Sequence, residues 1–360
     1  MQTKNVGILS VGVYLPETRR RNDHWSPDVV ARWRSKAAAR LQRTQGEFAH
    51  LEDKGLRMAL EALAALGDDP FQGLEERRVM SADMTAADME TMAARDAIAR
   101  AGIDPQQIDL LLSYTMCPDY INVPTGCVVH ANLGLREHCQ TMAVDAVCNS
   151  FIMQLTLAQS MIQSGRARYA LLTQSSAITR MPGSGEHYDT WWGDAGTAVI
   201  VGPVAENAGI VGVSHYTDGT LHKALVAGVP GKRWFDLGEV IAYSEDHRAN
   251  FDMIAKIAER SKQVLDDCFA ESKVTADKID FYACHQAFLW LRDVTQRYVG
   301  MRNARWVDTF KWAGTVSAAN LPLVLATGER EGVLKSGDLV ALFQGGTGMT
   351  WSGMTLRWGT

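Results

Sequence analysis

This sequence contains no closely spaced pair of cysteines. The six cysteines among its 360 residues stand at 117, 127, 139, 148, 268 and 284, without a Cys-x-x-Cys step. A disulfide framework is improbable in a soluble chain of this length, and a structural zinc site needs closely spaced cysteine or histidine ligands. We therefore expect no metal ion, and a reducing, cytoplasmic setting.

The chain also lacks an excess of positive charge and a long apolar segment. A net charge of −5 and a pI near 6.0 argue against a nucleic-acid binder, which normally carries a basic stripe. No apolar run approaches the ~20 residues that span a bilayer. Met1 to Leu15 contains no long apolar region or cleavage site of a signal peptide. These absences predict a protein without a nucleic-acid or membrane partner.

Two short landmarks recur along the chain. An Ile-Asp step at 108–109 recurs at 279–280, each time directly before a short apolar run. A Ser-Gly step at 164–165 recurs at 336–337, again before a strand-like run. The two steps lie 56 residues apart in the first half (108 to 164) and 57 in the second (279 to 336). This spacing indicates an internal duplication, and chance recurrence of common dipeptides is the alternative.

Helical patterns alternate with short apolar runs. The segments Ala86 to Ala101, Phe151 to Gln163 and Phe251 to Phe269 have the periodicity of helices, and glycines follow the first two. Runs such as Leu110 to Tyr114 and Ala170 to Thr173 are too short and apolar to alternate, which is typical of strands covered on both faces. The sequence therefore predicts a layered α/β protein.

No Ser-rich or Pro-rich linker separates the two halves, so we expect them to pack as one body. We place the N-terminal half at 1–205 and the C-terminal half at 206–360. The charged stretch 32–76 has a helical period and lies outside the repeat. We interpret this stretch as an insertion or an extended cap.

Cys148 stands where an apolar segment ends and the helix expected from Phe151 begins. A thiol at a helix N-terminus lies near unpaired backbone N–H groups and the positive end of the helix dipole, which favour the thiolate. The alternative is that Cys148 is a small buried hydrophobic residue, as most free cysteines are.

His285 directly follows the apolar run Phe281 to Cys284. Open α/β sheets build their sites at the carboxyl ends of such strands, where a neutral imidazole can act as a base. A structural or solvated histidine is the alternative. By the duplication offset, the small-residue segment Ala313 to Pro322 is the counterpart of the Cys148 turn, with Cys148 matching position 319 or 320.

A glycine-rich segment, Gln344 to Trp351, follows what we expect to be the final core strand. Its backbone N–H groups could face an anion and form an oxyanion hole. Glycines in such segments more often simply make turns, and no Walker lysine is present.

Together these segments resemble the ketoacyl synthase III (3-oxoacyl-ACP synthase III)-like family of the thiolase superfamily. The resemblance covers nearly the whole chain outside 32–76, with motifs in the family's order and roughly its spacing. These motifs are Asp145-Ala146-Val147-Cys148, Trp192-Gly193-Asp194-Ala195-Gly196, His285-Gln286-Ala287, Ser317-Ala318-Ala319 and Gly348-Met349-Thr350-Trp351. The resemblance implies a five-layer αβαβα sandwich built from two duplicated halves, usually assembled as a homodimer.

By this resemblance, Cys148 is the nucleophile that takes an acyl group from acyl-CoA or an acyl carrier protein. His285 assists it, and the N–H groups of Cys148 and Gly348 form the oxyanion hole. No cofactor is implied beyond the CoA or phosphopantetheine thioester that serves as substrate.

Three further residues are expected near the substrate. Relatives place residues near the CoA or phosphopantetheine entrance at the position of Arg180, although an ordinary surface arginine is the alternative. We expect Trp192 and Val123 to line the acyl tunnel, although aromatic residues in such runs more often belong to the core.

The sequence departs from the family at one functional position. Family members usually carry an asparagine where this chain has Thr315. In the family, His and Asn together donate hydrogen bonds to the malonyl thioester carbonyl, and a threonine hydroxyl is shorter and has one donor. Asn320 could replace the amide, but we expect it to face elsewhere on its helix.

We therefore favour transfer of the acyl group to an oxygen or nitrogen of a small-molecule acceptor, in specialised (polyketide-type) metabolism. Decarboxylative Claisen condensation with a malonyl thioester is the alternative. A silent partner subunit is a third reading, disfavoured because Cys148 and His285 are both retained.

Overall fold

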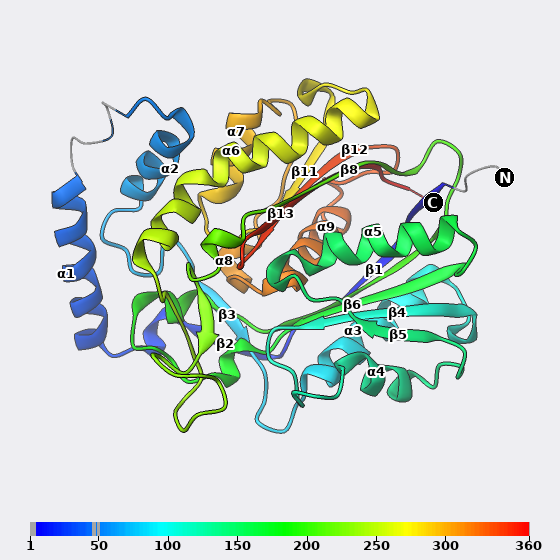
Figure 1. The fold of residues 1–360 in the computed structure, drawn as a ribbon, viewed down its shortest axis with the longest axis horizontal. Helices are drawn as coiled ribbons and strands as arrows, with labels where there is room; N and C mark the ends of the chain where they lie inside the picture. The colour runs from blue at the N-terminus through cyan, green and yellow to red at the C-terminus, as the bar shows by residue number, and fades with distance from the viewer. Residues whose placement is uncertain (1–4, 45–47, 49–50, 360) are drawn as a thin grey trace.

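Two large sheets form the framework of the protein. The structure, a computed structural model, describes residues 5–44, 48 and 51–359 (Figure 1). In spatial order the first sheet contains β1 (Val6–Tyr14), β7 (Ala195–Pro203), β6 (Tyr169–Ser176), β4 (Ile108–Thr115) and β5 (Gln140–Ala143). The second contains β8 (Gly209–Thr217), β13 (Thr350–Arg357), β12 (Leu339–Gly346) and β11 (Phe281–Cys284).

Both sheets follow one topology. Their strands correspond as β1 with β8, β7 with β13, β6 with β12, and β4 with β11. In each sheet the first two pairings are antiparallel and the third is parallel. The parallel pairing of β4 with β5 has its counterpart in a single parallel bridge between Phe281 and Arg305. The predicted duplication within an α/β fold is therefore confirmed. The predicted division at 205–206 falls in the connection between β7 and β8.

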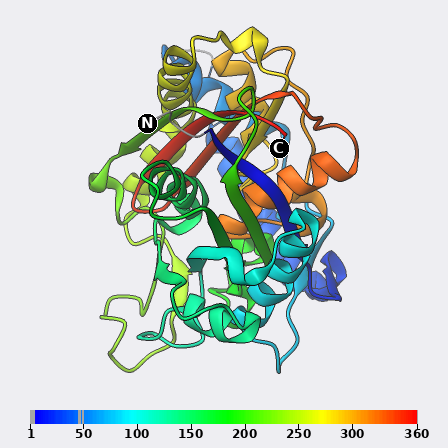
Figure 2. The ribbon, with the colours of Figure 1, turned by 90° about the vertical axis from the view of Figure 1, so that its right-hand side faces the viewer.

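The helices form three layers around these sheets (Figure 1). Between the sheets lie α5 (Ser150–Gln163) and α9 (Asn320–Arg330). The outer face of the first sheet is covered by α3 (Ala86–Ala101) and α4 (Thr125–Leu133), and that of the second by α6 (His247–Ser272) and α7 (Leu291–Val299). Figure 2 shows β12 and β13 of the second sheet, in red, above the first sheet. The five-layer αβαβα sandwich is confirmed.

Local sequence explains where these helices begin and end. Thr85 caps α3, because its hydroxyl accepts from the N–H of Asp88 while the Asp88 carboxylate accepts from the N–H of Thr85. Gly102 ends the helix in the left-handed conformation, at φ +63°. The predicted bounds of α3 are confirmed, and the helix predicted over 251–269 lies inside the longer α6.

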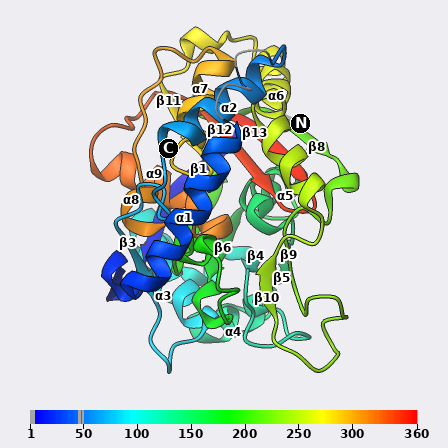
Figure 3. The same cartoon turned by 90° about the vertical axis from the view of Figure 1, so that its left-hand side faces the viewer.

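The stretch 32–76 lies at one end of the molecule (Figure 3). It contains most of α1 (Pro27–Thr44), α2 (Lys54–Ala65) and the start of β3 (Glu76–Val79), which pairs with β2 (Thr18–Arg21). The indole N–H of Trp33 donates to the carbonyl of Gly185 at 3.1 Å, which fastens α1 to the loop after β6. Residues 45–47, 49 and 50 of this stretch lie outside the described residues.

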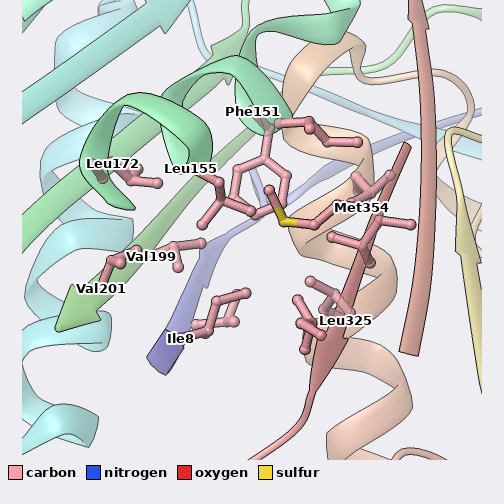
Figure 4. Packing of buried hydrophobic residues seen from close by; sticks show 14 of the residues in the cluster. Ile8, Phe151, Leu155, Leu172, Val199, Val201, Leu325 and Met354 are labelled. Atoms are coloured by element: carbon pink, nitrogen blue, oxygen red, sulfur yellow. The ribbon is translucent and has the colours of Figure 1, made fainter. Parts of the chain in front are cut away.

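The largest apolar core lies between the sheets and joins both halves (Figure 4). Phe151 and Leu155 of α5 point toward Met354 of β13 and Leu325 of α9. All four side chains are fully buried, and burying each contributes about 1.5–3 kcal/mol. This shared core packs the two halves as one body, and it holds α5, which begins beside Cys148, in a fixed position.

Two details of the sequence prediction are wrong. The glycine-rich segment does not follow the final core strand, because β13 comes after it and pairs with β12. The counterpart of the Cys148 turn is also shifted. The 3₁₀ turn Val147–Asn149 precedes α5, and the 3₁₀ turn Ser317–Ala319 precedes α9, an offset of 170 residues (147 to 317). Cys148 therefore corresponds to Ala318.

Candidate active site

Cys148 is held in a tight turn between β5 and α5. The preceding residue, Val147, has φ +52°, a left-handed conformation that is unusual for a β-branched side chain. Ser150 supports the turn, since its hydroxyl accepts from the N–H of Ala146 at 2.9 Å and donates to the carbonyl of Val147 at 2.7 Å. Cys148 is 8% exposed, so its sulfur lies in a buried position at the start of α5.

The matching turn of the second half approaches the sulfur. Ser317 occupies the place of Val147 and has nearly the same strained conformation, with φ +53°. Its Oγ lies 3.5 Å from Cys148 Sγ. The duplication therefore places the turn before α9 against the turn before α5, and a hydroxyl from one half contacts the thiol of the other.

His285 extends from the carboxyl end of β11. Its backbone N–H donates to the carbonyl of Phe343 at 2.9 Å, which continues the parallel pairing with β12. The next residue, Gln286, is fixed on both sides. The backbone N–H of Gln286 donates to Asn320 Oδ1 at 2.6 Å, and its side-chain Oε1 accepts from the backbone N–H of Thr309 at 2.7 Å. These bonds fix the backbone that carries the imidazole.

Cys148, His285 and Thr315 line one cavity of about 590 Å³. Thr315 is held at the wall because its N–H donates to the carbonyl of Trp191 at 2.8 Å, while its carbonyl accepts from the N–H of Gly193 at 3.1 Å. The sulfur from the first half and the imidazole from the second thus face the same space. Covalent catalysis by a cysteine and a base requires both groups in one site, and this cavity contains both residues.

Burial dominates the electrostatics of the thiol. It raises the pKa of Cys148 to about 11, and the hydrogen bond from Ser317 offsets only part of this rise. The backbone N–H at the turn also acts to lower the pKa, as a helix N-terminus is expected to do, but removing a thiolate from water outweighs these local donors. The Cys148 side chain is therefore the neutral thiol at neutral pH.

Burial shifts the pKa of His285 downward, opposite to its effect on the Cys148 thiol. It lowers the pKa of His285 to about 4, while the Asn320 carboxamide acts to raise it. Within the described residues, no atom meets hydrogen-bond geometry with His285 Nδ1 or with Asn320 Nδ2. Both atoms are buried, and the Asn320 carboxamide is near enough to the imidazole to act on its pKa although Asn320 does not line the cavity. At neutral pH the imidazole is uncharged and can accept a proton.

Comparisons with known proteins match the segments that carry Cys148 and His285 to one protein family. Residues 142–219, which include Cys148, match the family model described as 3-oxoacyl-[acyl-carrier-protein (ACP)] synthase III. Residues 269–358, which include His285, match the C-terminal model of the same family. The chain belongs to the ketoacyl synthase III-like family of the thiolase superfamily. Members of this family are condensing or acyl-transferring enzymes that act on acyl-CoA or acyl-ACP.

Solved structures of the ketoacyl synthase III fold resemble the whole chain. The 3-oxoacyl-[acyl-carrier-protein] synthase III of Aquifex aeolicus is 23% identical, with a TM-score of 0.76 over 98% of this chain and 100% of that one. FabH of Pseudomonas aeruginosa is 21% identical, with a TM-score of 0.76 over 99% of both chains. Xanthomonas campestris OleA, crystallised with lauric acid and lauroyl-CoA, is 21% identical, with a TM-score of 0.72 over 99% of this chain and 100% of that one.

Of the remaining residues predicted from the ketoacyl synthase III resemblance, one lines the cavity and the others lie outside its lining. Trp192 lines the cavity beside Thr315, to which a parallel bridge connects it. Gly348 lies in the turn between β12 and β13, with φ +126°. Val123 is 39% exposed and does not line the cavity. Arg180 donates through Nη2 to the carbonyls of Ser81, at 2.6 Å, and of its neighbours 82 and 84, which is how a structural surface arginine behaves.

Sequence reasoning did not foresee the contacts that three residues make around this site. Ser317 belongs to a quoted motif, but nothing in the sequence shows that its hydroxyl reaches Cys148. Asn320 does not line the cavity, and its carboxamide binds the backbone N–H of Gln286 and acts on the pKa of His285. Gly346 has no room for a side chain, because an added Cβ would lie 2.2 Å from the carbonyl oxygen of Ala146. The duplication offset, corrected to 170, is the signal that would have paired Ser317 with the cysteine turn.

A membrane-spanning role finds no structural counterpart in the helices. In the part of the chain that the structure describes, no helix has both the length and the apolar character needed to cross a bilayer.

The pH dependence of thiol alkylation should reveal the raised pKa of Cys148. The thiolate is the reactive form, and below a pKa of about 11 its fraction rises tenfold per pH unit. We therefore expect the iodoacetamide rate at Cys148 to rise about tenfold per unit from pH 7 to 9. Peptide mass spectrometry measures this rate, with Cys127→Ser removing an exposed competing thiol. A rate that is already level at pH 7 would show instead that the helix terminus stabilises the thiolate.

Proposed function

We propose that this chain is an acyltransferase that carries an acyl group on Cys148 and passes it to an oxygen or nitrogen acceptor. The single observation that supports this proposal is the cavity shared by Cys148, His285 and Thr315. It combines a nucleophile and a base with a threonine where relatives use an amide. We place the reaction in specialised, polyketide-type metabolism and expect a homodimer in the cytoplasm.

In the first step, His285 takes the proton of the Cys148 thiol as sulfur attacks the carbonyl carbon of an acyl-CoA or acyl-ACP thioester. The C–S bond to the carrier then breaks, and the departing thiolate receives the proton from the imidazolium. Because the thiol pKa is about 11 and that of His285 about 4, proton transfer accompanies the attack rather than preceding it. Backbone N–H groups of Cys148 and Gly348 would stabilise the oxyanion.

In the second step, His285 removes the proton from a hydroxyl or amine of the acceptor. The acceptor atom attacks the acyl-cysteine carbonyl, the C–S bond to Cys148 breaks, and the imidazolium returns its proton to the sulfur. The step forms an ester or amide and regenerates the thiol, so no oxidant, reductant or cofactor is consumed.

The threonine favours this reaction over condensation. Decarboxylation of a malonyl thioester develops negative charge on the thioester oxygen, which two donors stabilise in the family. In this chain, Asn320 accepts the backbone N–H of Gln286 through Oδ1 and does not belong to the residues that line the cavity, so we do not assign it the role of the second donor. Thr315 therefore remains the one side chain at the family's amide position.

Thioester donors can be screened directly. The OleA structure with lauroyl-CoA supports a CoA thioester as one donor class. Incubation with acetyl, malonyl and longer acyl-CoA thioesters, followed by intact mass measurement, should show one acyl adduct that disappears in Cys148→Ala. If no donor in this series, offered on CoA and on a carrier protein, labels the protein, the proposal is wrong.

Supplying malonyl thioester to the acylated enzyme separates the two reactions. Acyl transfer predicts ester or amide formation without CO₂. Release of CO₂ in step with loss of the adduct would instead support condensation, with Thr315 or a water in place of the amide.

A further inference from the structure

The turn that faces Cys148 carries a hydroxyl where its counterpart in the first half carries an alkyl side chain. Ser317 and Val147 occupy equivalent places before α9 and α5, with φ values of +53° and +52°. Residues strained in this way persist only where the surrounding structure holds them, and they cluster at active sites. The place of the nucleophile itself is taken in the second turn by Ala318. The hydroxyl of Ser317 is therefore the functional group that this turn presents.

The Ser317 hydroxyl is committed to the sulfur of Cys148. Ser317 is fully buried, and its Oγ lies 3.5 Å from Cys148 Sγ. Its backbone is fixed as well, because the Ser317 carbonyl accepts from the backbone N–H of Asn320 at the start of α9. Buried hydroxyls are almost always hydrogen-bonded, and here the nucleophile is the partner. The packing of the two halves thus places this hydroxyl beside the reacting atom.

The charge on the sulfur decides which atom donates. Between the neutral thiol and the hydroxyl, either atom can donate. A thiolate has no proton, so it can only accept, and the Ser317 hydroxyl must then be the donor. Hydrogen bonds to an ionised acceptor are shorter and roughly twice as strong as those between neutral groups. The contact therefore strengthens as the sulfur gains charge, which is the property that accelerates a chemical step.

Two titratable groups that interact with the sulfur, Tyr114 and Asp145, do not favour its ionisation. The Asp145 carboxylate acts to raise the pKa of Cys148. Tyr114 is buried, its hydroxyl donates to Met116 Sδ at 3.4 Å, and burial raises its pKa well above the usual value, so the phenol is neutral. The Ser317 hydroxyl also acts to lower the pKa of Tyr114. Of the two acceptors, a charged sulfur is stronger than a neutral phenol oxygen.

The lining of the cavity offers the sulfur no free positive charge at rest. Among the described residues that line it, Lys36 is the one with a permanent positive charge, and it pairs with Glu186 at 2.8 Å. Both side chains are substantially exposed, so solvent screens their charges. His285 is uncharged at neutral pH until it takes up a proton. Stabilisation of a developing thiolate therefore depends on neutral donors, of which the Ser317 hydroxyl contacts the sulfur directly.

From these contacts we infer that Ser317 is a further catalytic residue, whose hydroxyl donates a hydrogen bond to the Cys148 sulfur whenever that sulfur carries negative charge. In the acyl transfer proposed above, this happens as the sulfur attacks the donor thioester. It happens again as the C–S bond of the acyl-cysteine breaks and its electron pair returns to the sulfur. The Ser317 proton stays on its own oxygen in both steps, and His285 moves the proton that is transferred. The catalytic role rests on the proposed acyl transfer, but the hydrogen bond can be tested without an acyl donor.

The test compares Ser317→Thr with Ser317→Val, which have nearly the same shape and differ in the hydroxyl. Val147 shows that a β-branched residue can adopt the conformation that both variants need. The probe is iodoacetamide, which reacts with the thiolate and forms no oxyanion. Its rate at Cys148 is measured by peptide mass spectrometry at neutral pH in the Cys127→Ser background. We expect Ser317→Val to react about 10- to 100-fold more slowly than Ser317→Thr, the usual contribution of a hydrogen bond to a charged group.

Ser317→Ala gives a second comparison that adds no bulk to the turn, and it should slow alkylation by a similar factor relative to the unmodified protein. Ser10→Ala is its matched control. Ser10 is also buried, and its hydroxyl donates to the carbonyl of Ala97 at 2.6 Å, away from the cavity. This variant loses a buried hydrogen bond as well, but Cys148 should react at the unmodified rate.

Equal alkylation rates in Ser317→Thr and Ser317→Val, or equal rates in Ser317→Ala and Ser10→Ala, would overturn the inference. An acyl-CoA that labels the unmodified enzyme should acylate the Thr and Val variants at rates that differ by a similar factor. The two proposals can fail separately. A difference in alkylation without any acyl adduct in the donor screen would support the Ser317 hydrogen bond and refute the acyltransferase. An acyl adduct that forms equally fast in both variants would refute the role of Ser317 and leave the acyltransferase in place.

Discussion

Replacing His285 with alanine is expected to slow acylation of Cys148 by about 10²–10⁴-fold at pH 7, the usual contribution of a general base. The physical reason is the buried thiol. With a pKa of about 11, Cys148 holds almost no thiolate at neutral pH and depends on a neighbouring base. His285 lines the same cavity and is itself uncharged. Rapid quenching of the reaction with an acyl-CoA donor, followed by intact mass measurement, gives the rate.

The pH profile distinguishes a base from a structural support. In His285→Ala the rate should rise about tenfold per pH unit, because hydroxide then generates the thiolate, and the difference from the unmodified enzyme should narrow toward pH 10. Added imidazole should restore part of the rate. His222→Ala is the control, since His222 is exposed and lies outside the cavity lining. Acylation of His285→Ala at the full rate at pH 7 would place the base elsewhere.

The fold could be predicted largely from periodicity and repetition. Apolar runs such as Leu110 to Tyr114 are central parts of buried strands, and the Ile-Asp and Ser-Gly steps mark equivalent strands of the two sheets. The offset was wrong by one or two residues because it was taken from landmarks before the strands, whereas the turns that carry Cys148 and Ser317 follow them. Loop lengths differ between halves, so a spacing read in one place does not transfer unchanged to another.

The sequence could predict which residues are candidates for the site, but not the direction of their pKa shifts. Their positions at a strand–helix turn and at a strand end made Cys148 and His285 candidates, the family resemblance assigned their roles, and both residues line one cavity. The direction of the Cys148 pKa shift could not be read from sequence, because it depends on how much water the second half and α5 exclude from the sulfur. The support of His285 by Asn320 is equally a product of packing between α9 and the end of β11.

The segment 32–76 contributes more than its sequence indicated. A charged helical stretch outside the repeat predicts a surface cap, and α1 and α2 do lie at one end of the molecule. Leu63 and Gln72 of this stretch also line the cavity that holds Cys148. The cap therefore contributes part of the wall of the cavity that holds Cys148.

Replacing Gly346 with alanine is expected to slow acylation by at least about 10²-fold. Gly346 ends β12 directly behind the cysteine turn, where an added Cβ would lie 2.2 Å from the carbonyl oxygen of Ala146 and 2.9 Å from the amide nitrogen of Asn149. Neither atom belongs to a flexible side chain, so the turn itself must move. Displacing a reacting group by about 1 Å can cost roughly 10²-fold in rate, even though Gly346 does not line the cavity.

The loss must be separated from general destabilisation, and Gly12→Ala provides that comparison. Gly12 of β1 is equally crowded, since its added Cβ would lie 2.1 Å from the carbonyl oxygen of Ala93, but it packs against α3 on the far side of the first sheet. Overpacking of this kind typically costs about 1–3 kcal/mol, so both variants should melt at lower temperature. Measured below both melting temperatures, acylation should be slow in Gly346→Ala and close to normal in Gly12→Ala. Equal rates in the two folded variants would mean that the glycine strand does not set the position of Cys148.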